Sequence, residues 1–249
     1  MTREYNVFTW NIREMTTPVR HHRVYAYLRR RNIHIACLQE THLTGAELAK
    51  VVKRWRGQVY GTQYSAFSRE VLIWVAPGIP FVKTRVIIVP EGRTVVLEGL
   101  LDGRALNVVV VYGPNLGQRE FLEGLSPACF EDPGAPGLWA GDFNCVHSSS
   151  LDRSVPPLPG TQGIKATQGF RRWTGTMALH DVWRAAHPLE QEIYYAPGHM
   201  VHTRLDYIFC SSDLANKVVS SEYLGRTLSD HSQLKITVNW GEGRPPIQI

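Results

Sequence analysis

Two apolar runs of strand length, separated by a two-residue turn signal, most constrain the fold of this chain. Thr94–Leu101 and Arg104–Tyr112 flank the dipeptide Asp102-Gly103. Asp-Gly between two apolar runs is typical of a tight β-hairpin, because both residues tolerate the positive φ that the turn requires. Such runs are also far shorter than the roughly 18–20 apolar residues that cross a membrane. The sequence therefore predicts a buried hairpin and no membrane partner.

Further short runs predict more strands, and two segments predict helices. Pro18 suits the first position of a helix, and Val24, Tyr27 and Leu28 then follow at helical spacing. Thr167–Thr176 is the second predicted helix. The other predicted strands are Glu4–Trp10, Ile33–Gln39, Glu70–Val75, Thr84–Val89, Leu138–Gly141, Leu205–Cys210 and Gln233–Trp240. We expect one domain with two packed, mainly antiparallel sheets, helices outside them, and surface loops at 126–137 and 156–163.

The positive charge is concentrated in the first quarter of the chain. Residues 1–56 contain 11 basic and 4 acidic side chains, whereas residues 57–249 contain 16 and 18. Of the basic residues, 21 are Arg and 6 are Lys, and Arg prevails where phosphate is contacted in a bidentate way. This pattern favours a polyanionic partner. Codon composition, or a solvated helix end at 29–31, would also explain part of it.

Several common site types have no support in the sequence. The four cysteines (Cys37, Cys129, Cys145 and Cys210) form no CxxC pair, so free thiols are expected rather than a zinc site. The first fifteen residues contain acids and no unbroken apolar stretch, unlike a signal peptide. Gly-rich nucleotide loops, HExxH and GxSxG are absent from the sequence, and we expect no small-molecule cofactor.

Polar side chains stand at the ends of several predicted strands. Any one of them could be an ordinary turn or cap residue, but together they offer carboxylates, amides, a phenol and an imidazole. This mixture suits a hard divalent ion such as Mg²⁺, water activation and phosphate stabilisation. The residues are Asn11, Glu40, Tyr112, Asp142, Asn144, Asp206, Ser229, Asp230 and His231.

These residues belong to an ordered series of motifs. WN (10–11), LQET (38–41), VYGPN (111–115), GDFN (141–144), RLDYIF (204–209) and SDH (229–231) occur in this order. The series resembles the endonuclease/exonuclease/phosphatase superfamily. The resemblance implies an α/β (α+β) four-layer sandwich of the DNase I type, in which two packed, mainly antiparallel sheets are flanked by helices.

Three further segments narrow the resemblance. LDRS at 151–154, LQETHL at 38–43 and the YAP turn at 195–197 are similar to the apurinic-type endonuclease domains of LINE (non-LTR) retrotransposons. The family's Gly after the first motif is missing, since Asn11 is followed by Ile12-Arg13-Glu14. The resemblance implies a domain over 1–240 and a tail at 241–249 that begins a linker to a reverse transcriptase. It also implies action in the nucleus after synthesis in the cytoplasm.

The resemblance assigns roles to the residues at the strand ends. Glu40 would be the direct Mg²⁺ ligand (Mn²⁺ being a possible substitute), with Asn11 beside it and Asp230 as a contributor. Asp142 would be the general base, and Asn144 would orient water or phosphate. His231 would stabilise the scissile phosphate, with Asp206 orienting its imidazole. Tyr112 would contact the phosphate or the leaving oxygen.

The implied partners are a double-stranded DNA target and, through the rest of the polyprotein, the element's RNA. Arg153 leads the candidate DNA contacts, which also include Arg13, Arg204, His202 and Ser229. An ion pair with Glu14 is the alternative for Arg13. In LINE relatives the hairpin corresponding to 198–203, which here contains His199, Met200 and His202, is variable and helps to select the DNA site.

The implied reaction is Mg²⁺-dependent nicking of duplex DNA that leaves a 3′-hydroxyl and a 5′-phosphate. The 3′-hydroxyl would then prime reverse transcription at the target. Alternatives on the same fold are an apurinic/apyrimidinic-site repair endonuclease, a phosphatase or deadenylase, and a catalytically inactive DNA-binding module. The basic first quarter and the LDRS segment argue against the phosphatase branch, and the complete set of site residues argues against an inactive module.

Overall fold

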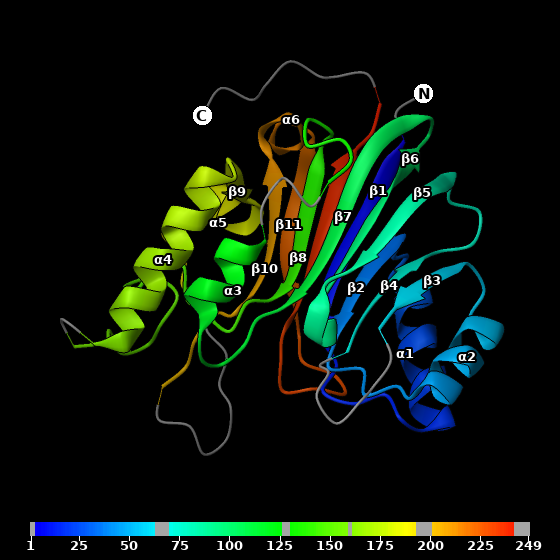
Figure 1. Cartoon of the computed structure of the whole chain (residues 1–249), viewed down its shortest axis with the longest axis horizontal. Helices are drawn as coiled ribbons and strands as arrows, with labels where there is room; N and C mark the ends of the chain where they lie inside the picture. Colours follow the sequence, from blue (N-terminus) through cyan, green and yellow to red (C-terminus); the bar gives the residue numbers. More distant parts are fainter. Residues whose placement is uncertain (1–2, 63–69, 126–129, 159–160, 193–200, 242–249) are drawn as a thin grey trace.

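Two six-stranded sheets pack face to face in the computed structural model, which describes residues 3–62, 70–125, 130–158, 161–192 and 201–241 (Figure 1). The first sheet has the order β11 (Val218–Leu224), β12 (Gln233–Asn239), β1 (Glu4–Asn11), β2 (Ile35–Gln39), β4 (Val71–Val75), β3 (Gln58–Gly61). The second has the order β5 (Phe81–Ile88), β6 (Thr94–Leu101), β7 (Arg104–Tyr112), β8 (Gly137–Asp142), β10 (Asp206–Ser211), β9 (Leu179–Asp181). Within each sheet one central pair is parallel, β1 with β2 and β7 with β8, and the other pairs are antiparallel.

Helices cover the outer face of each sheet and complete four layers (Figure 1). The first sheet is covered by α1 (Pro18–Arg30) and α2 (Gly45–Arg54), and the second by α3 (Gln118–Gly124) and α4 (Gln162–Thr176). The shorter helices are η1 (Pro90–Gly92), α5 (Val182–Ala186) and α6 (Ser212–Ala215). Alternating strand residues such as Val7, Ile73 and Val108 fill the space between the sheets. The four-layer architecture expected from the motif series is confirmed.

Local sequence signals explain where the main elements begin. Thr17 caps α1 by accepting a hydrogen bond from the Arg20 amide, and Pro18 occupies the first turn, as predicted. Thr44 and Glu47 form a capping box at the start of α2. Asp102 (φ 50°) and Gly103 (φ 75°) make the tight turn between β6 and β7. The central hairpin therefore has the predicted bounds.

The structure extends and corrects the predicted elements elsewhere. Helix α4 begins at Gln162, five residues before the predicted start at Thr167, so the predicted loop at 156–163 is shorter than expected. Helices α2 and α3 and strands β3 and β11 were not predicted. Three cysteines are free and buried (Cys37, Cys145 and Cys210), whereas Cys129 lies outside the described residues. Among the described helices, none combines the length and the apolar character needed to span a membrane.

Candidate active site

Strand register brings the predicted catalytic residues to one edge of the sandwich. Asp142, at the end of β8, is paired in register with Tyr112 on β7 and with Asp206 on β10. In the other sheet, Asn11 ends β1 beside Gln39, so that Glu40 follows at the same edge. Side chains from both sheets therefore meet where the parallel strands end.

An imidazole–carboxylate pair forms the centre of this edge. His231 Nδ1 lies 2.8 Å from Asp206 Oδ2 and 3.9 Å from Asp142 Oδ2. Burial by itself would lower the pKa of His231, but the charge of Asp206, the hydrogen bond to it and the charge of Asp142 raise the pKa to about 10. The imidazole is therefore held as a cation that donates from Nδ1 to Asp206.

The ionised forms of Asp142 and Asp206 are disfavoured, because both carboxylates are buried and lie close together. Burial and the charge of Asp206 raise the pKa of Asp142 to about 7, against the opposing effects of His231 and Asn11. Burial also raises the pKa of Asp206, with His231 opposing and Glu40 and Asp230 adding to the rise. Carboxylates crowded in this way are stabilised by a bound cation or a retained proton.

The donor set fits a hard divalent cation. A carboxylate oxygen of Asp142 and one of Asp206 lie within 4.8 Å of each other and of a ring nitrogen of the His231 cation. Asp206 Oδ1 is buried and has no hydrogen-bond partner among the described residues. Asn11 Nδ2 donates to Glu40 Oε1 and to Asp142 Oδ2, both at 3.0 Å. The structure thus groups predicted ligands Glu40 and Asn11 with Asp142 and adds an unpartnered oxygen of Asp206.

An ion pair joins Arg13, two residues after the end of β1, to Asp230, which precedes His231. Arg13 Nη1 donates to Asp230 Oδ2 at 2.8 Å, so its partner is not the neighbouring Glu14. Arg13 has φ 62°, a left-handed conformation that is costly for a long side chain. The Arg13 amide donates to Asn11 Oδ1 at 3.0 Å, which compensates part of this cost. The pair places a cation and a carboxylate beside the catalytic edge.

Two glycines allow the close backbone contacts around Asp142. A Cβ on Gly113 would lie 2.2 Å from the Phe143 carbonyl oxygen, and one on Gly141 would lie 1.9 Å from that of Val111. Asn144 (φ 49°) donates from its backbone amide to Asp142 Oδ1 at 2.9 Å. The motif GDFN therefore supplies the Asp142 carboxylate and also fixes its orientation through the Asn144 backbone amide.

Tyr112 and Ser229 lie at the same edge, and contacts with neighbouring residues hold both side chains in place. Tyr112 is buried at 9% exposure, and the Arg93 guanidinium lies 5.4 Å from the centre of its ring. Ser229 Oγ donates to the Asn11 carbonyl at 2.7 Å and accepts from the His231 amide at 3.2 Å. Ser229 thus joins the loop that carries His231 to the end of β1, while its predicted contact with DNA stays a prediction.

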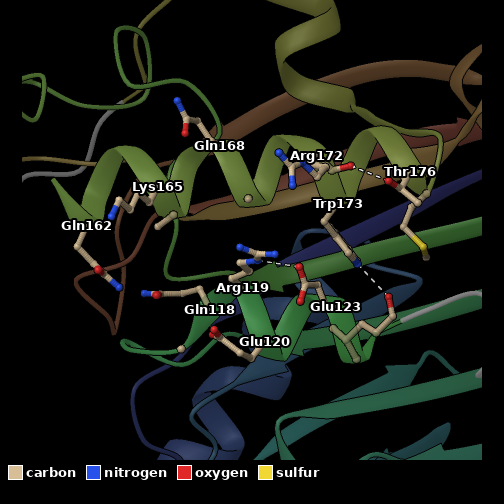
Figure 2. A pocket seen from close by; sticks show the side chains of 15 residues that line it. Gln118, Arg119, Glu120, Glu123, Gln162, Lys165, Gln168, Arg172, Trp173 and Thr176 are labelled. Atoms are coloured by element: carbon tan, nitrogen blue, oxygen red, sulfur yellow. Dashed lines mark hydrogen bonds and ion pairs between the residues drawn. The ribbon is translucent and has the colours of Figure 1, made fainter. Parts of the chain in front are cut away.

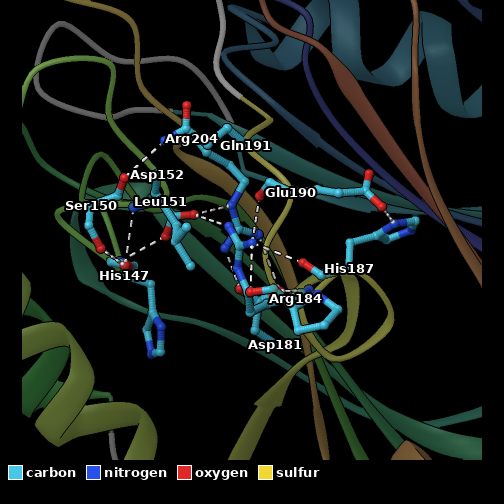
Figure 3. Close-up of polar contacts among 12 residues, drawn as sticks. His147, Ser150, Leu151, Asp152, Asp181, Arg184, His187, Glu190, Gln191 and Arg204 are labelled. Carbon is cyan, nitrogen blue, oxygen red and sulfur yellow. Dashed lines mark hydrogen bonds and ion pairs between the residues drawn. The ribbon is translucent and has the colours of Figure 1, made fainter.

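The prediction that Arg204 contacts DNA is wrong. Its side chain is fully buried, donates from Nε to Asp152 Oδ1 at 2.8 Å, and pairs with Asp181 at 2.5 Å (Figure 3). Arg184 Nη2 also donates to Asp152 Oδ1, at 2.7 Å. A buried guanidinium whose donors meet carboxylates has nothing left to offer a phosphate at the surface. Arg204 instead fixes the start of β10, two residues before Asp206.

The remaining candidate DNA contacts lie beside this buried cluster. Arg153 is half-buried, donates from Nε to the Val155 carbonyl at 2.7 Å, and forms an isolated β-bridge with Thr203. The His202 amide donates to Ser154 Oγ at 2.9 Å. The LDRS segment and the end of the predicted hairpin are therefore joined. His199, Met200 and the YAP turn lie outside the described residues.

Two polar residues near Glu40 were not identified from the sequence. Glu70 is fully buried, precedes β4 and accepts a hydrogen bond from the His42 amide at 3.1 Å. The His42 ring lies between Glu70 Oε2 at 3.6 Å and Glu40 Oε2 at 3.9 Å. The sequence signal for Glu70 was its position directly before the apolar run of β4. This strand pairs with β2, and Glu40 follows β2.

A hollow of about 540 Å³ lies on the flank of the second sheet, between α3 and α4 (Figure 2). Arg119, Lys165 and Arg172 line it together with Glu120 and Glu123, and Arg119 pairs with Glu123. Its lining includes none of the predicted site residues. The strand-end cluster, and not this hollow, is therefore the candidate active site.

Comparison with known proteins agrees with this geometry. The sequence matches the Endonuclease/Exonuclease/phosphatase family over residues 8–231. The chain belongs to this family. The chain is also similar to the Transposon TX1 uncharacterized 149 kDa protein of Xenopus laevis, with 28% identity over 248 residues. The match covers 96% of this chain but only 18% of that relative, so the chain spans about a fifth of its length.

Solved structures of similar fold include endonucleases of two kinds. The catalytic domain of Xenopus laevis APE2 superposes with a TM-score of 0.76 at 17% identity, covering 96% of this chain and 94% of that one. The AP endonuclease from Archaeoglobus fulgidus gives 0.73 at 18%, covering 93% and 98%. The endonuclease domain of TRAS1, a telomere-specific non-LTR retrotransposon, gives 0.67 at 17%, covering 96% and 100%. At these identities the likeness establishes the fold of this family member.

Proposed function

We propose that this chain is a DNA endonuclease that nicks duplex DNA by hydrolysing one phosphodiester bond, leaving a 3′-hydroxyl and a 5′-phosphate. The observation that carries the proposal is the group formed by Asp142, Asp206 and His231 at the end of the sandwich, with Asn11 and Glu40 attached to it. A buried carboxylate, a cationic imidazole and further oxygen ligands are the parts that hydrolysis of a phosphodiester needs.

Each residue of the group has a distinct task in this reaction. Asp142, whose pKa is raised to about 7, accepts a proton from the attacking water. The His231 cation faces the phosphate and balances the charge that develops on its oxygens. Asp206 holds that cation through the 2.8 Å contact with Nδ1. Tyr112 and Asn144 position the phosphate and the water.

Glu40, Asn11 and Asp206 would hold a divalent cation, Mg²⁺ or Mn²⁺. When bound, the ion supplies a positive charge that polarises the phosphoryl oxygens and stabilises the leaving oxygen. The buried, unpartnered Oδ1 of Asp206 and the raised pKa of Asp142 both support a cation at this position.

The cellular context that we propose is retrotransposition. The chain resembles part of a transposon protein, and one solved structure of the same fold comes from a non-LTR retrotransposon. The 3′-hydroxyl at the nick would prime reverse transcription of the element's RNA, which the rest of a polyprotein would bind. The nick would be made in the nucleus after synthesis of the protein in the cytoplasm.

A supercoiled-plasmid assay tests the proposal. With Mg²⁺ we expect open circles that DNA ligase reseals, because the nick has a 3′-hydroxyl and a 5′-phosphate, and with EDTA we expect none. Since the similar structure from Archaeoglobus fulgidus is an AP endonuclease, the same protein is offered a duplex with one abasic site. Cleavage confined to the abasic duplex would favour a repair enzyme, and binding without cleavage of either substrate would favour an inactive DNA-binding module.

A further inference from the structure

The basic side chains of the first quarter of the chain gather on helices α1 and α2 and the turns that follow them. Eight of the eleven basic residues among positions 1–56 are exposed on these two segments. They are Arg23, Arg29, Arg30, Arg31, Lys50, Lys53, Arg54 and Arg56. We call them the α1–α2 basic face.

The two helices lie side by side on the outer face of the first sheet (Figure 1). Tyr25 of α1 stacks on Trp55, which directly follows α2, with ring centres 5.5 Å apart. The Arg56 amide donates to the Tyr25 hydroxyl at 3.2 Å. The two segments that carry these cations are therefore packed directly against each other.

These cations are not neutralised within the described part of the protein. None of the eight forms an ion pair with a described residue. Arg29 and Arg31 contact the rings of Tyr25 and Tyr27, which leaves their charge in place. On α2 the Glu47 carboxylate is held in the capping box by Thr44. A single-sign surface of this size attracts a polyanion.

Helix dipoles account for only part of the pattern. Arg29, Arg30, Lys53 and Arg54 lie in the last turns of their helices, where cations are favourable. Arg31 is the C-cap residue of α1 and is favoured in the same way, whereas Arg23 and Lys50 lie earlier in the helices and Arg56 lies beyond the C-cap of α2. These last three residues need another explanation, since a helix terminus is stabilised only by charges within its last turn.

The face lies away from the catalytic edge. Helix α1 begins there, since Arg20 Nη2 donates to the Ile12 carbonyl, and its 13 residues span about 20 Å along the axis. At its far end Asn32 accepts a hydrogen bond from Asn6 Nδ2, near the start of β1, whereas Asn11 ends that strand. Arg29–Arg31 therefore lie at the opposite end of α1 from the catalytic edge, about 20 Å away along the helix axis.

We propose that the α1–α2 basic face binds the phosphodiester backbone of a second nucleic-acid segment, separate from the one in the catalytic site. Because side chains of this face are mainly flexible cations without a pocket of fixed donors, binding reads charge rather than base sequence. The segment is duplex DNA distant from the nick, since double-stranded DNA is the nucleic acid on which this domain itself is proposed to act and it carries the denser phosphate charge. The inference rests on the proposed function for the identity of both segments.

The test uses D142N protein, so that DNA is not cut, and measures affinity by fluorescence anisotropy over a range of salt concentrations. The R29Q/R30Q/R31Q and K50Q/K53Q/R54Q triple variants are compared with K165Q/R171Q/R172Q, which removes the same charge from exposed positions on α4. Each α1–α2 variant should lose roughly tenfold or more in affinity, and its salt slope should fall by about 2–3, since each lost phosphate contact removes about 0.9 for a duplex and about 0.7 for a single strand. R29K/R30K/R31K should keep the wild-type slope.

A second measurement asks whether the two segments bind together. Protein saturated with a labelled ten-base-pair duplex is titrated with a second labelled duplex or with single-stranded RNA of mixed sequence. A ternary complex with the second duplex that forms when the surface residues are wild type, and is lost in the α1–α2 variants but not in the α4 variant, supports the proposal. Equal loss in all three charge variants, strict competition between the two duplexes, or a ternary complex with the RNA and not with the second duplex overturns it. If this face binds DNA but protein with Asp142 intact does not nick the plasmid, the proposed function alone is contradicted.

Discussion

His231 Nδ1 lies 2.8 Å from Asp206 Oδ2, and this contact joins the loop before β12 to the first residue of β10. Asp206 is fully buried and Asp142 is almost fully buried. The His231 cation therefore faces two carboxylates that are shielded from solvent. The charge of the imidazole is therefore set by the protein and not by the solvent. This relationship leads to the first prediction.

Replacing Asp206 by Asn should lower the pKa of His231 from about 10 towards its ordinary value, because the largest opposing effect to burial is lost. The imidazole signals in NMR spectra of metal-free protein, followed from pH 5 to 11, measure this. Nicking at pH 8 should fall roughly 10²-fold or more, because the His231 cation and one of the proposed metal-holding carboxylates are lost together. A His231 pKa that does not move would show that Asp206 does not control the imidazole.

Asp142→Asn should stabilise the metal-free protein at alkaline pH while strongly slowing nicking. The folded protein binds the Asp142 proton more tightly than the unfolded chain, since the pKa rises from 3.8 to about 7. The stabilisation due to this proton is complete below about pH 4 and is lost as pH rises to about 7, at a cost of at most about 4 kcal/mol.

Thermal unfolding in EDTA at pH 8 measures this difference. The Asn variant should unfold several degrees higher than wild type, at roughly 2–4 °C per kcal/mol for a chain of this size. At pH 4 the difference should shrink, because both proteins are then uncharged at position 142. An Asn variant that is less stable at pH 8 would mean that the carboxylate is not strained in the folded state.

Removing one partner of the buried Arg204 cluster should unfold the protein more easily. Asp152→Asn leaves both Arg204 and Arg184 without a carboxylate oxygen that they share, and breaking a buried pair costs about 3–5 kcal/mol. Urea unfolding measures the loss. Arg153→Gln, at the neighbouring half-buried position, is the matched control and should change stability by less than about 1 kcal/mol.

The central hairpin and the catalytic series could be predicted from sequence because their signals are local. Asp102-Gly103 specifies its own turn, and Asp142 and Asp206 stand in short motifs whose apolar flanks define the strands. The convergence of their side chains then follows from strand ends meeting at one edge of the sandwich.

Other features depend on long-range packing that no local pattern reveals. The sequence does not show that Arg204 meets Asp152 and Asp181, so a buried guanidinium was mistaken for a DNA contact. Glu70 was hidden for the same reason, because its proximity to His42 arises only from the pairing of β2 with β4. Strand β11 was not predicted either, since Val218–Leu224 is partly exposed and contains two serines and a glutamate.

The rate of plasmid nicking under single-turnover conditions tests the central claim most directly. Wild-type protein, Asp142→Asn and the control Asp213→Asn, an exposed carboxylate in α6, are compared at pH 8 with Mg²⁺. We expect wild type and the control to nick at the same rate, and Asp142→Asn to be slower by roughly 10²–10⁴-fold while binding the plasmid equally well. Nicking by Asp142→Asn at the wild-type rate would contradict the assignment of the strand-end cluster as the active site.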